Sequence, residues 1–337
     1  EAIYKFIEKK TTENENGIYL RLSWFGGEPL LAKDKIIDFM NKLESLKSKH
    51  PVEIHASLIT NGYLLTPSLF EKLVDCGITT YQVTLDGNAD THDTLRTLRD
   101  GSPTFDVIYN NLKGIKELTH PDSEFSFSVR ANFLRNNVDS MKRLLDRFMT
   151  DFSEDKRFSI YFRPVYNFET TRDDIDPLTP DICTTSEGLH IQNELTFKSM
   201  SINTENTKLS KVTDPLPKPT YSWCPSIRAN AYIIGADGAI FSCDTLMIDK
   251  KDSVGEITPE GDINFNSNAK LWKNTIFEEG NEIIKECTEC KLLPICMGGC
   301  RRSRLISGQK PCFWTVEDIE RSMKEYSKLS QANTNEP

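Results

Sequence analysis

Residues 18–29 have the sequence IYLRLSWFGGEP, and this stretch is the clearest indication of the fold. Ile18 to Phe25 is short and rich in aliphatic and aromatic residues, so we predict a strand that ends at Gly26-Gly27-Glu28-Pro29. Residues 33–49 follow with apolar side chains at helical spacing. Their predicted buried face consists of Ile36, Ile37, Met40, Leu43 and Leu46. A strand followed directly by a helix is typical of one βα unit of a parallel sheet.

The same alternation repeats along the first half of the chain, which indicates an α/β fold. Further strands are predicted at Glu53–Thr60, Thr79–Asp86, Phe125–Phe133 and Phe158–Val165. Further helices are predicted at Glu1–Lys10, Pro67–Cys76, Phe105–Leu118, Val138–Phe152 and Ser186–Met200. Five strands are therefore visible, and the first helix is expected to follow a strand outside this sequence.

Length and composition exclude several classes of protein. A chain of 337 residues and 38.4 kDa is long enough for roughly two domains and too long for a disulfide-stapled miniprotein. Lysine and arginine number 41 against 50 acidic residues, and this net charge of -9 argues against nucleic acid as a partner. The mean hydropathy is -0.45, and no apolar run approaches the ~18 residues of a membrane span, so no membrane partner is expected.

The sequence gives no support for export. The sequence starts at Glu1 without a methionine and lacks the basic, apolar and small-residue regions of a signal peptide, so its start looks cut. A reducing, cytoplasmic compartment is therefore expected. Clustered thiols in such a compartment are more often metal ligands than cystines.

The cysteines are unevenly distributed, and they indicate how the chain is organised. Cys76 and Cys183 stand alone, whereas seven cysteines lie between Cys224 and Cys312. Residues 166–220 are rich in polar residues and proline, which is typical of a connector. We predict a barrel domain at 1–165, a linker at 166–220, a cysteine-bearing domain at 221–327 and a tail at 328–337. In the third of these, short strands are predicted at Asn230–Ile234 and Ile240–Ser242, with turns at 236–238 and 260–262.

The spacing of the seven cysteines predicts a metal site. The order is Cys224, Gly238-x4-Cys243, Cys287-x2-Cys290-x5-Cys296-x3-Cys300 and Cys312. A zinc ribbon made by the four cysteines from Cys287 to Cys300 fits this spacing. Two four-iron clusters fit it as well, with one of their eight iron positions left without a cysteine. The spacing alone does not choose between zinc and iron.

The whole pattern resembles, ligand for ligand, the SPASM domain that follows the barrel in many radical SAM enzymes. That resemblance assigns Cys287, Cys290, Cys296 and Cys312 to a distal auxiliary [4Fe-4S] cluster. It assigns Cys224, Cys243 and Cys300 to a nearer cluster. Cys183 is either the fourth ligand of the nearer cluster or a loop thiol, and we favour a loop thiol because it lies far upstream of Cys224.

Three strand ends resemble the S-adenosylmethionine (SAM) site of radical SAM enzymes. By itself, Gly26-Gly27-Glu28-Pro29 is a strand-to-helix turn with exposed carbonyls and a carboxylate. The resemblance implies that these carbonyls and Glu28 hold the amino group of SAM. It further implies ribose and methionine contacts from Thr60, Asn61 and Thr84 and a carboxylate contact from Arg130. Each of the latter residues could equally form a turn or cap a helix.

Each of the other candidate residues also has a purely structural interpretation. The pattern His92-Asp93-x2-Arg96 is family-like, but we expect a solvated helix start with an ion pair. Asp244 follows Cys243 and is a candidate catalytic base, as in sulfatase-maturating relatives, or else a loop cap. Arg301, Arg302 and Arg304 are expected to form a solvated basic strip, and Cys76 is expected to be a core thiol.

The hallmark Cys-x3-Cys-x2-Cys of the SAM cluster is absent from this sequence. We therefore predict a partial (β/α)6 TIM-like barrel that lacks its first strand and its SAM-cluster loop, followed by a small α+β SPASM domain. Truncation is favoured over degeneracy as the explanation. The third [4Fe-4S] cluster is expected only in the full-length protein, and this chain alone is not expected to cleave SAM.

The resemblance implies a radical reaction on a peptide or protein. SAM cleavage would generate a deoxyadenosyl radical that removes a hydrogen atom from the substrate, with flavodoxin or ferredoxin as electron donor. We favour a maturase of ribosomally made peptides that forms a thioether or carbon-carbon crosslink. The first alternative is an anaerobic sulfatase-maturating enzyme that oxidises Cys or Ser to formylglycine. The alternative of another class is a non-catalytic iron-sulfur or zinc protein.

Overall fold

The computed structural model describes residues 1–165, 181–201, 217–219, 224, 226, 228, 230–247, 249–273, 285–307, 312 and 314–334. They form two compact units that do not follow the order of the chain. The sheet unit comprises the described residues of Glu15–Asn167, Arg172–Pro215 and Ser322–Pro337. The cysteine unit comprises the described residues of Glu1–Asn14 and Leu216–Arg321. Most of the predicted linker at 166–220 lies outside the described residues, and the predicted domain boundaries stay predictions.

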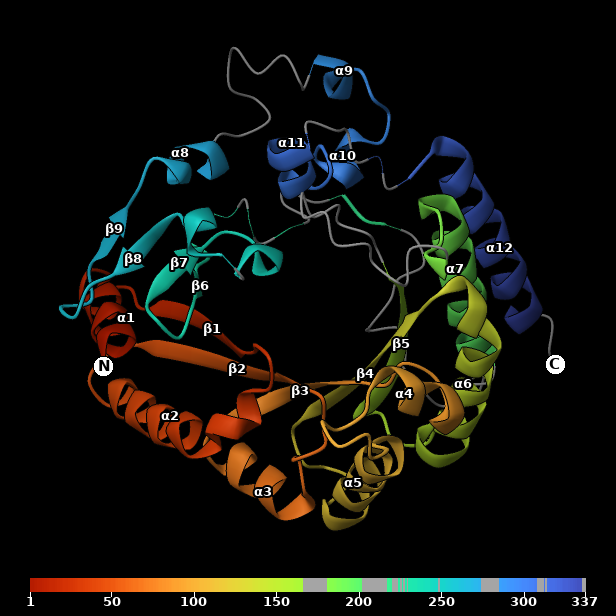
Figure 1. The fold of residues 1–337 in the computed structure, drawn as a ribbon, viewed down its shortest axis with the longest axis horizontal. Coiled ribbons are helices and arrows are strands. Elements are labelled where there is room, and N and C mark those ends of the chain that lie inside the picture. The colour runs from red at the N-terminus through yellow and green to blue at the C-terminus, as the bar shows by residue number, and fades with distance from the viewer. Residues whose placement is uncertain are drawn as a thin grey trace. The chain divides into compact units, whose positions relative to one another are not determined.

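The sheet unit is built on five parallel strands in the order β1-β2-β3-β4-β5 (Figure 1). The strands are β1 (Ile18–Trp24), β2 (Val52–Thr60), β3 (Ile78–Thr84), β4 (Ser126–Phe133) and β5 (Phe158–Pro164). All five predicted strands are confirmed. Because spatial order follows chain order, each strand lies beside the next one along the sequence, as successive βα units require.

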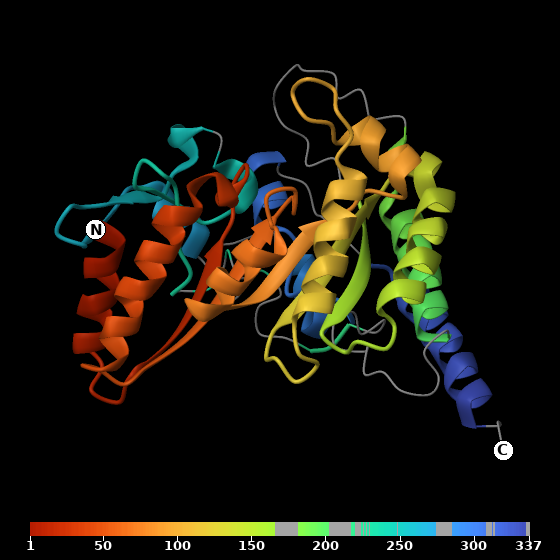
Figure 2. The ribbon, with the colours of Figure 1, turned by 90° about the horizontal axis from the view of Figure 1, so that it is seen from below.

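Helices between the strands cover one face of this sheet (Figures 1 and 2). They are α2 (Lys33–Lys47), α3 (Pro67–Asp75), α4 (Ala89–Leu95), α5 (Phe105–Leu118) and α6 (Val138–Phe152). Their short 3-10 neighbours are η1 (Pro29–Ala32) and η2 (Arg135–Asn137). Helix α2 buries Ile36, Met40, Leu43 and Leu46, as its spacing predicts, whereas Ile37 of the predicted face is only half-buried. Helix α3 begins at Pro67 because the preceding Thr66 side chain accepts a hydrogen bond from the Leu69 amide.

Stacked aromatic rings fill the space between the sheet and these helices. Phe127 of β4 stacks on Tyr81 with ring centroids 5.0 Å apart and on Phe158 with centroids 5.4 Å apart. Phe70 of α3 and Phe152 of α6 contact the same row, and all five rings are fully buried. Such rings bury a large apolar area each, so this core is the main source of stability in the sheet unit.

Strand β4 alternates strictly between the two faces of the sheet. Phe127, Val129 and Ala131 are buried on the helix-covered face. Ser128, Arg130 and Asn132 alternate with them and are only half-buried. Since side chains two positions apart in a strand lie on the same face, Arg130 and Asn132 are neighbours on the polar face.

Helix α7 (Thr185–Ser201) and the part of helix α12 (Val316–Thr334) from Ser322 onward also belong to the sheet unit. Helix α7 contacts β5 and α6, and ion pairs join it to α6 through Lys142–Glu194 and Lys198–Asp146. Helix α12 meets α7 where Asn193 Nδ2 donates to Ser322 Oγ at 2.6 Å. The chain is therefore helical well beyond residue 327, where the sequence predicts a tail.

The cysteine unit contains a four-stranded antiparallel sheet in the order β6-β7-β8-β9. The strands are β6 (Ile233–Ile234), β7 (Ala239–Phe241), β8 (Gly255–Ile257) and β9 (Ile263–Phe265). The short helices are η6 (Asp244–Leu246), η7 (Lys250–Asp252), α8 (Asn268–Lys273), α9 (Lys285–Thr288), α10 (Leu293–Cys296) and α11 (Arg301–Ser307). The two predicted turns are confirmed, because they connect β6 to β7 and β8 to β9.

Helix α1 (Ala2–Thr12), from the start of the chain, belongs to the cysteine unit. Its Lys5 Nζ donates to the Pro259 carbonyl at 2.9 Å, and the Phe6 ring meets the edge of Tyr232 at 5.5 Å. Gly261 has a φ of +86°, and a Cβ there would lie 2.6 Å from the Phe6 nitrogen. Glycine is therefore required at this position by both its conformation and the close approach of α1.

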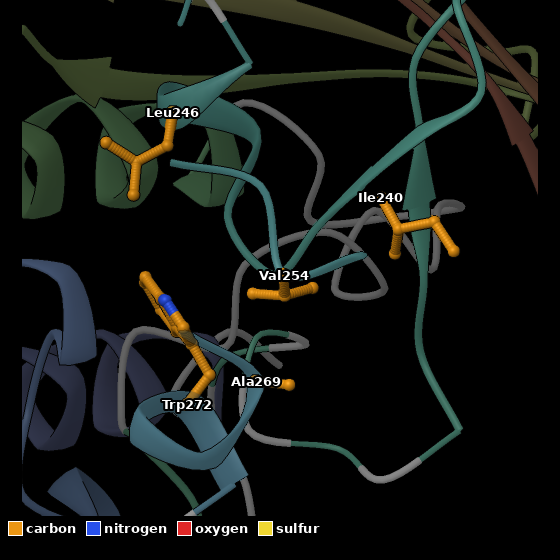
Figure 3. Close-up of a cluster of buried hydrophobic side chains, with 5 residues drawn as sticks. All are labelled: Ile240, Leu246, Val254, Ala269 and Trp272. Carbon is orange, nitrogen blue, oxygen red and sulfur yellow. The ribbon is translucent and has the colours of Figure 1, made fainter. Parts of the chain in front are cut away.

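A small apolar cluster holds the antiparallel sheet to α8 (Figure 3). Its buried members are Ile240, Leu246, Val254, Ala269 and Trp272. This cluster is much smaller than the aromatic core of the sheet unit. Among the residues that the structure describes, no helix is both long and apolar enough to cross a membrane.

Candidate functional site

Glu28 ties the loop after β1 to the end of β2. Its carboxylate accepts hydrogen bonds from the Leu30 amide at 3.0 Å, the Thr60 hydroxyl at 2.6 Å and the Asn61 amide at 2.8 Å. A carboxylate has about four acceptor positions, so these three donors leave about one for an ammonium group. Glu28 therefore organises this edge of the sheet as well as presenting a negative charge.

Thr60 and Asn61 form the turn at the end of β2. Thr60 Oγ1 accepts from the Gly62 amide at 3.0 Å, and Asn61 Oδ1 accepts from the Tyr63 amide at 2.9 Å. Gly62 has a φ of +82°, and a Cβ there would lie 2.7 Å from Val83 Cγ1. The turn interpretation that the sequence left open is thus confirmed for both side chains, whose roles toward a ligand stay a prediction.

Gly26 and Gly27 leave the loop backbone beside Glu28 without side chains. Among the described residues other than its chain neighbours, no atom lies within 4 Å of a Cβ built on either glycine. A ligand therefore has room to approach this backbone closely.

Thr84 is the last residue of β3 and pairs in the parallel ladder with Arg130, which lies within β4. The Leu85 amide donates to the Arg130 carbonyl at 3.0 Å, which fixes the end of β3 to β4. The Arg130 side chain is half-buried, and its Nε donates to Asn132 Oδ1 at 2.8 Å. No acceptor within the described parts of the chain binds its two η nitrogens, so these donors are available to an anion.

The motif His92-Asp93-x2-Arg96 is built around a buried histidine and is not a solvated helix start. Arg96 forms an ion pair, but its Nε donates to Asp86 Oδ2, which lies outside the motif. The predicted solvation is wrong, because His92 is 0% exposed. Its Nδ1 accepts from the Asp86 amide at 3.0 Å, and its Nε2 lies 3.1 Å from Thr104 Oγ1. Asp93 then accepts from the amides of residues 104 and 105 at the start of α5.

Burial lowers the pKa of His92 to about 4, so the ring is neutral at pH 7. Because Nδ1 accepts a hydrogen bond, the proton of the neutral ring lies on Nε2, which donates to Thr104. The ring thereby connects the end of β3 to the start of α5.

Sequence reasoning missed Asp86 and Asn132 as members of this site. Asp86 Oδ1 accepts from both the Asn132 amide at 3.1 Å and the Asn132 side-chain Nδ2 at 2.9 Å. The two-residue spacing of Arg130 and Asn132 on a predicted strand was a signal that could have linked these two side chains. Nothing in the sequence pattern pointed to the contact with Asp86.

In the cysteine unit, Cys224 and Cys243 lie within electrostatic range of each other. Burial raises the pKa of the Cys243 thiol, and the nearby Asp244 and Cys224 raise it further. Cys243 Sγ lies 3.1 Å from Thr245 Oγ1 and 3.8 Å from Asp244 Oδ1. The Asp244 carboxylate therefore lies directly beside one of the predicted ligands of the nearer cluster.

Cys296 lies near two other cysteines of the predicted distal set. Burial raises the pKa of its thiol, and the neighbouring Cys312 and Cys287 also raise it. Cys290 and Cys312 are exposed, and the Cys290 amide donates to the Cys287 carbonyl at 3.1 Å. These contacts bring Cys287, Cys296 and Cys312 into one region of the unit.

The arginines after Cys300 are not a solvated strip, so that prediction is wrong. Arg301 and Arg302 are buried, and Arg301 Nη2 donates to the Leu271 carbonyl at 2.6 Å. Arg304 is half-buried, and its Nη2 donates to Cys287 Sγ at 3.1 Å. Burial follows because α11 packs its first turn into the unit while guanidinium groups satisfy neighbouring carbonyls.

The two isolated cysteines lie in the sheet unit. Cys76 is buried and its Sγ donates to the Leu73 carbonyl at 3.2 Å, which confirms a core thiol. Cys183 is also buried, and burial raises the pKa of its thiol. All nine cysteines lie in the described part of the chain, and none forms a disulfide.

Two of the predicted ligands lie beside charged side chains. Arg304 Nη2 donates to Cys287 Sγ, and Asp244 Oδ1 lies 3.8 Å from Cys243 Sγ. Within the described ranges, no three His, Cys, Asp or Glu side chains lie close enough together to hold a single metal ion. The assignment of the seven cysteines to two clusters stays a prediction.

A known protein family matches the part of the chain that carries the first four parallel strands. Residues 6–148 match the family model of the Radical SAM superfamily. This part of the chain, less than half of its length, is therefore similar to a radical SAM domain.

Longer likenesses extend beyond this domain. A cysteine-type anaerobic sulfatase-maturating enzyme of Clostridium perfringens (strain 13 / Type A) is 23% identical over 310 residues, 88% of this chain and 77% of that protein. The structure of native anSMEcpe with bound AdoMet and Kp18Cys peptide has a TM-score of 0.60 at 20% identity, covering 100% of this chain and 91% of that one. Streptococcus suis SuiB bound to precursor peptide SuiA has a TM-score of 0.56 at 16% identity, covering 90% and 65%. The predicted α/β fold with a small second sheet is thus confirmed.

Proposed function

We propose that this protein is a radical SAM enzyme that modifies a residue of a peptide or protein substrate. One observation carries the proposal. Within the region similar to a radical SAM domain, one edge of the sheet presents the Glu28 carboxylate, two bare glycines and the guanidinium of Arg130. Parallel α/β sheets bind their ligands at the carboxyl ends of the strands, where these groups lie.

The charges at this edge complement the amino-acid end of SAM. Glu28 and the carbonyls of Gly26 and Gly27 would hold its ammonium group, and Arg130 would bind its carboxylate. Thr60, Asn61 and Thr84 would contact the remaining polar atoms, with Pro29 fixing the exit of the loop. When bound, SAM supplies by reductive cleavage the radical that takes a hydrogen atom from the substrate.

Two similarities support a peptide or protein substrate. The structurally similar anSMEcpe and SuiB were each solved with a bound peptide. The cysteine unit would contribute two auxiliary clusters, one on Cys224, Cys243 and Cys300 and one on Cys287, Cys290, Cys296 and Cys312. We propose that these clusters take up the electron released when the substrate radical is oxidised, and that a flavodoxin or ferredoxin supplies the reducing electron.

The first candidate product is a thioether or carbon-carbon crosslink in a ribosomally made peptide. Seven thiols leave one iron of the nearer cluster for a substrate thiolate. In thioether formation, a C–H bond and an S–H bond break and a C–S bond forms. One hydrogen atom leaves with the SAM-derived radical, one proton goes to a base, and one electron goes to a cluster.

The second candidate product is formylglycine, made from Cys or Ser. Its support is Asp244, whose Oδ1 lies 3.8 Å from Cys243 Sγ, and the likeness to a sulfatase-maturating enzyme over most of the chain. Asp244 would then accept the substrate proton as the catalytic base.

The deciding experiment is mass spectrometry of peptide products. A full-length form of the protein that carries the Cys-x3-Cys-x2-Cys loop is purified anaerobically and loaded with iron. It is incubated with SAM, dithionite and either a cysteine-containing precursor peptide or a sulfatase-derived cysteine peptide. A crosslink appears as the loss of two hydrogens without an aldehyde. Formylglycine appears as an aldehyde that reacts with a hydrazide, and this result would exclude the crosslinking function. Asp244→Asn should abolish formylglycine formation, whereas Glu256→Gln on the exposed part of β8 serves as its matched control.

A non-catalytic iron-sulfur or zinc protein is the competing hypothesis. Metal analysis after anaerobic purification separates it from an enzyme with clusters. Zinc without iron, together with no broad visible absorbance, would overturn the proposed function.

A further inference from the structure

Four side chains form a continuous polar chain that ends at Arg130. Arg96 Nε donates to Asp86 Oδ2, Asp86 Oδ1 accepts from Asn132 Nδ2 at 2.9 Å, and Asn132 Oδ1 accepts from Arg130 Nε at 2.8 Å. Asp86 is only 7% exposed, so the chain begins at a nearly buried carboxylate. These residues come from α4 and its flanks and from the ends of β3 and β4.

The direction of the Asn132 amide is determined by its neighbours. A carboxylate only accepts hydrogen bonds, so Asp86 must face the NH2 group of Asn132. The carbonyl oxygen of the same planar amide then faces the opposite way, toward Arg130. The Asn132 backbone amide also donates to Asp86 Oδ1 at 3.1 Å, which fixes the residue on both sides.

This hydrogen bond holds the guanidinium of Arg130 at one nitrogen and leaves the other two free of protein partners in the described ranges. An arginine side chain is long and has many rotamers, and ordering it costs free energy when it binds a ligand. An Nε that is already held removes part of this cost. The remaining two nitrogens form the fork that matches a carboxylate.

We propose that Asn132 and Asp86 are positioning residues that aim Arg130 at the carboxylate of SAM. The inference rests on the proposed function, since it takes SAM as the ligand of this edge. Asn132 contacts Arg130 directly, and Asp86 acts by orienting the amide of Asn132. His92 supports the same strand end through the Asp86 backbone amide, without contacting Arg130.

The test compares two ligands that differ by one group. The affinity of the anaerobically purified protein for SAM and for decarboxylated SAM is measured by isothermal titration calorimetry. Asn132→Leu keeps the size of the side chain but removes both hydrogen bonds. It should weaken SAM binding about tenfold, as expected for one charge-assisted hydrogen bond, and leave the binding of decarboxylated SAM unchanged. An equal loss for both ligands would show a merely structural role and would overturn the inference.

A second variant shows whether the effect passes through Arg130. In an Arg130→Ala background, Asn132→Leu should cause no further loss of SAM affinity, because the group that it aims is gone. An undiminished effect in that background would overturn the inference. Ser128→Ala is the matched control, because Ser128 lies on the same strand and face and its hydroxyl donates to the Tyr81 carbonyl at 3.2 Å. It should leave the ratio of the two affinities unchanged.

Failure of the proposed function gives a different result. If wild-type protein does not bind SAM, or binds both ligands equally, the SAM site itself is wrong, and the positioning role falls with it. If wild type prefers SAM and Arg130→Ala removes that preference but Asn132→Leu does not, the SAM site stands and only the positioning role is wrong.

Discussion

The two units of this protein are stabilised in different ways. The sheet unit has a row of fully buried aromatic rings, in which Phe127 stacks between Tyr81 and Phe158. The cysteine unit has a small apolar cluster around Ile240 and Trp272 and carries seven of the nine cysteines. A unit with little apolar core usually needs disulfides or metal in order to fold. From this comparison we expect the sheet unit to fold by itself and the cysteine unit to depend on the proposed clusters.

Removal of iron is expected to give the largest effect. Chelation under anaerobic conditions, or Cys296→Ser, should unfold much of the cysteine unit and leave the sheet unit folded, because metal binding there is coupled to folding. Hydrogen exchange should then show loss of protection in β7, β8 and α1, which belongs to the same unit, but not in β3 and β4.

Cys76→Ala is the control for this experiment, since Cys76 is a core thiol of the sheet unit and should not change the iron content. Equal protection of β7 and β8 with and without iron would contradict the comparison. It would show that the small apolar cluster is sufficient to hold that unit.

The second prediction tests the aromatic core. Phe127→Ala should lower the free energy of unfolding of the sheet unit by ~3–5 kcal/mol, because it removes a ring that is stacked on both sides and leaves a cavity. Chemical denaturation followed by circular dichroism measures the change. Phe265→Ala is the comparison in the cysteine unit, where the side chain is 44% exposed, and should cost less than about 1 kcal/mol. Similar losses for both variants would remove the contrast between the two cores.

The third prediction concerns the pH dependence of the sheet unit. The pKa of His92 is about 4 in the folded protein and 6.5 for an ordinary histidine, so the unfolded state binds the proton more tightly. The contribution of this ring to stability is therefore complete above pH 6.5 and is lost as the pH falls toward about 4. The loss amounts to roughly 3 kcal/mol.

Unfolding measured from pH 7 to pH 4 checks this dependence. His92→Gln should show a correspondingly weaker dependence than wild type, whereas replacement of the exposed His120 by Gln should not change it. Identical pH profiles for wild type and His92→Gln would show that this ring is not the group responsible.

The smallest expected effect is a shift in the midpoint potential of the proposed distal cluster when Arg304 is replaced. Arg304 Nη2 donates to Cys287 Sγ, and a guanidinium beside a ligand sulfur stabilises the more negative, reduced state of a cluster. Arg304→Gln should lower the midpoint potential of the distal cluster by about 60 mV, a tenfold change for a one-electron couple. A redox titration followed by EPR measures it. Arg304→Lys should restore part of the potential, and an unchanged potential in Arg304→Gln would exclude this role.

The repeated βα pattern was sufficient to predict much of the sheet unit. All five strands and the helices after them are confirmed, because buried strands and one-sided helices leave periodic patterns in the chain itself. Burial of His92 was not predictable, since the helix ADTHDTL has no apolar stripe to reveal it. Its environment comes from Asp86 and Thr104, which lie on either side of it along the chain. The position of Arg304 beside Cys287 likewise depends on how two short helices pack.

The order of the elements and the loop at Gly26 to Pro29 could be predicted from the chain alone, because residues close together encode them. By contrast, the packing of α1 on a sheet more than 200 residues later and the contact of Asp86 and Asn132 with Arg130 depend on the folded structure. These contacts are polar and join separate elements. A hydrogen bond between distant side chains leaves no periodicity in the sequence, whereas a buried apolar face does.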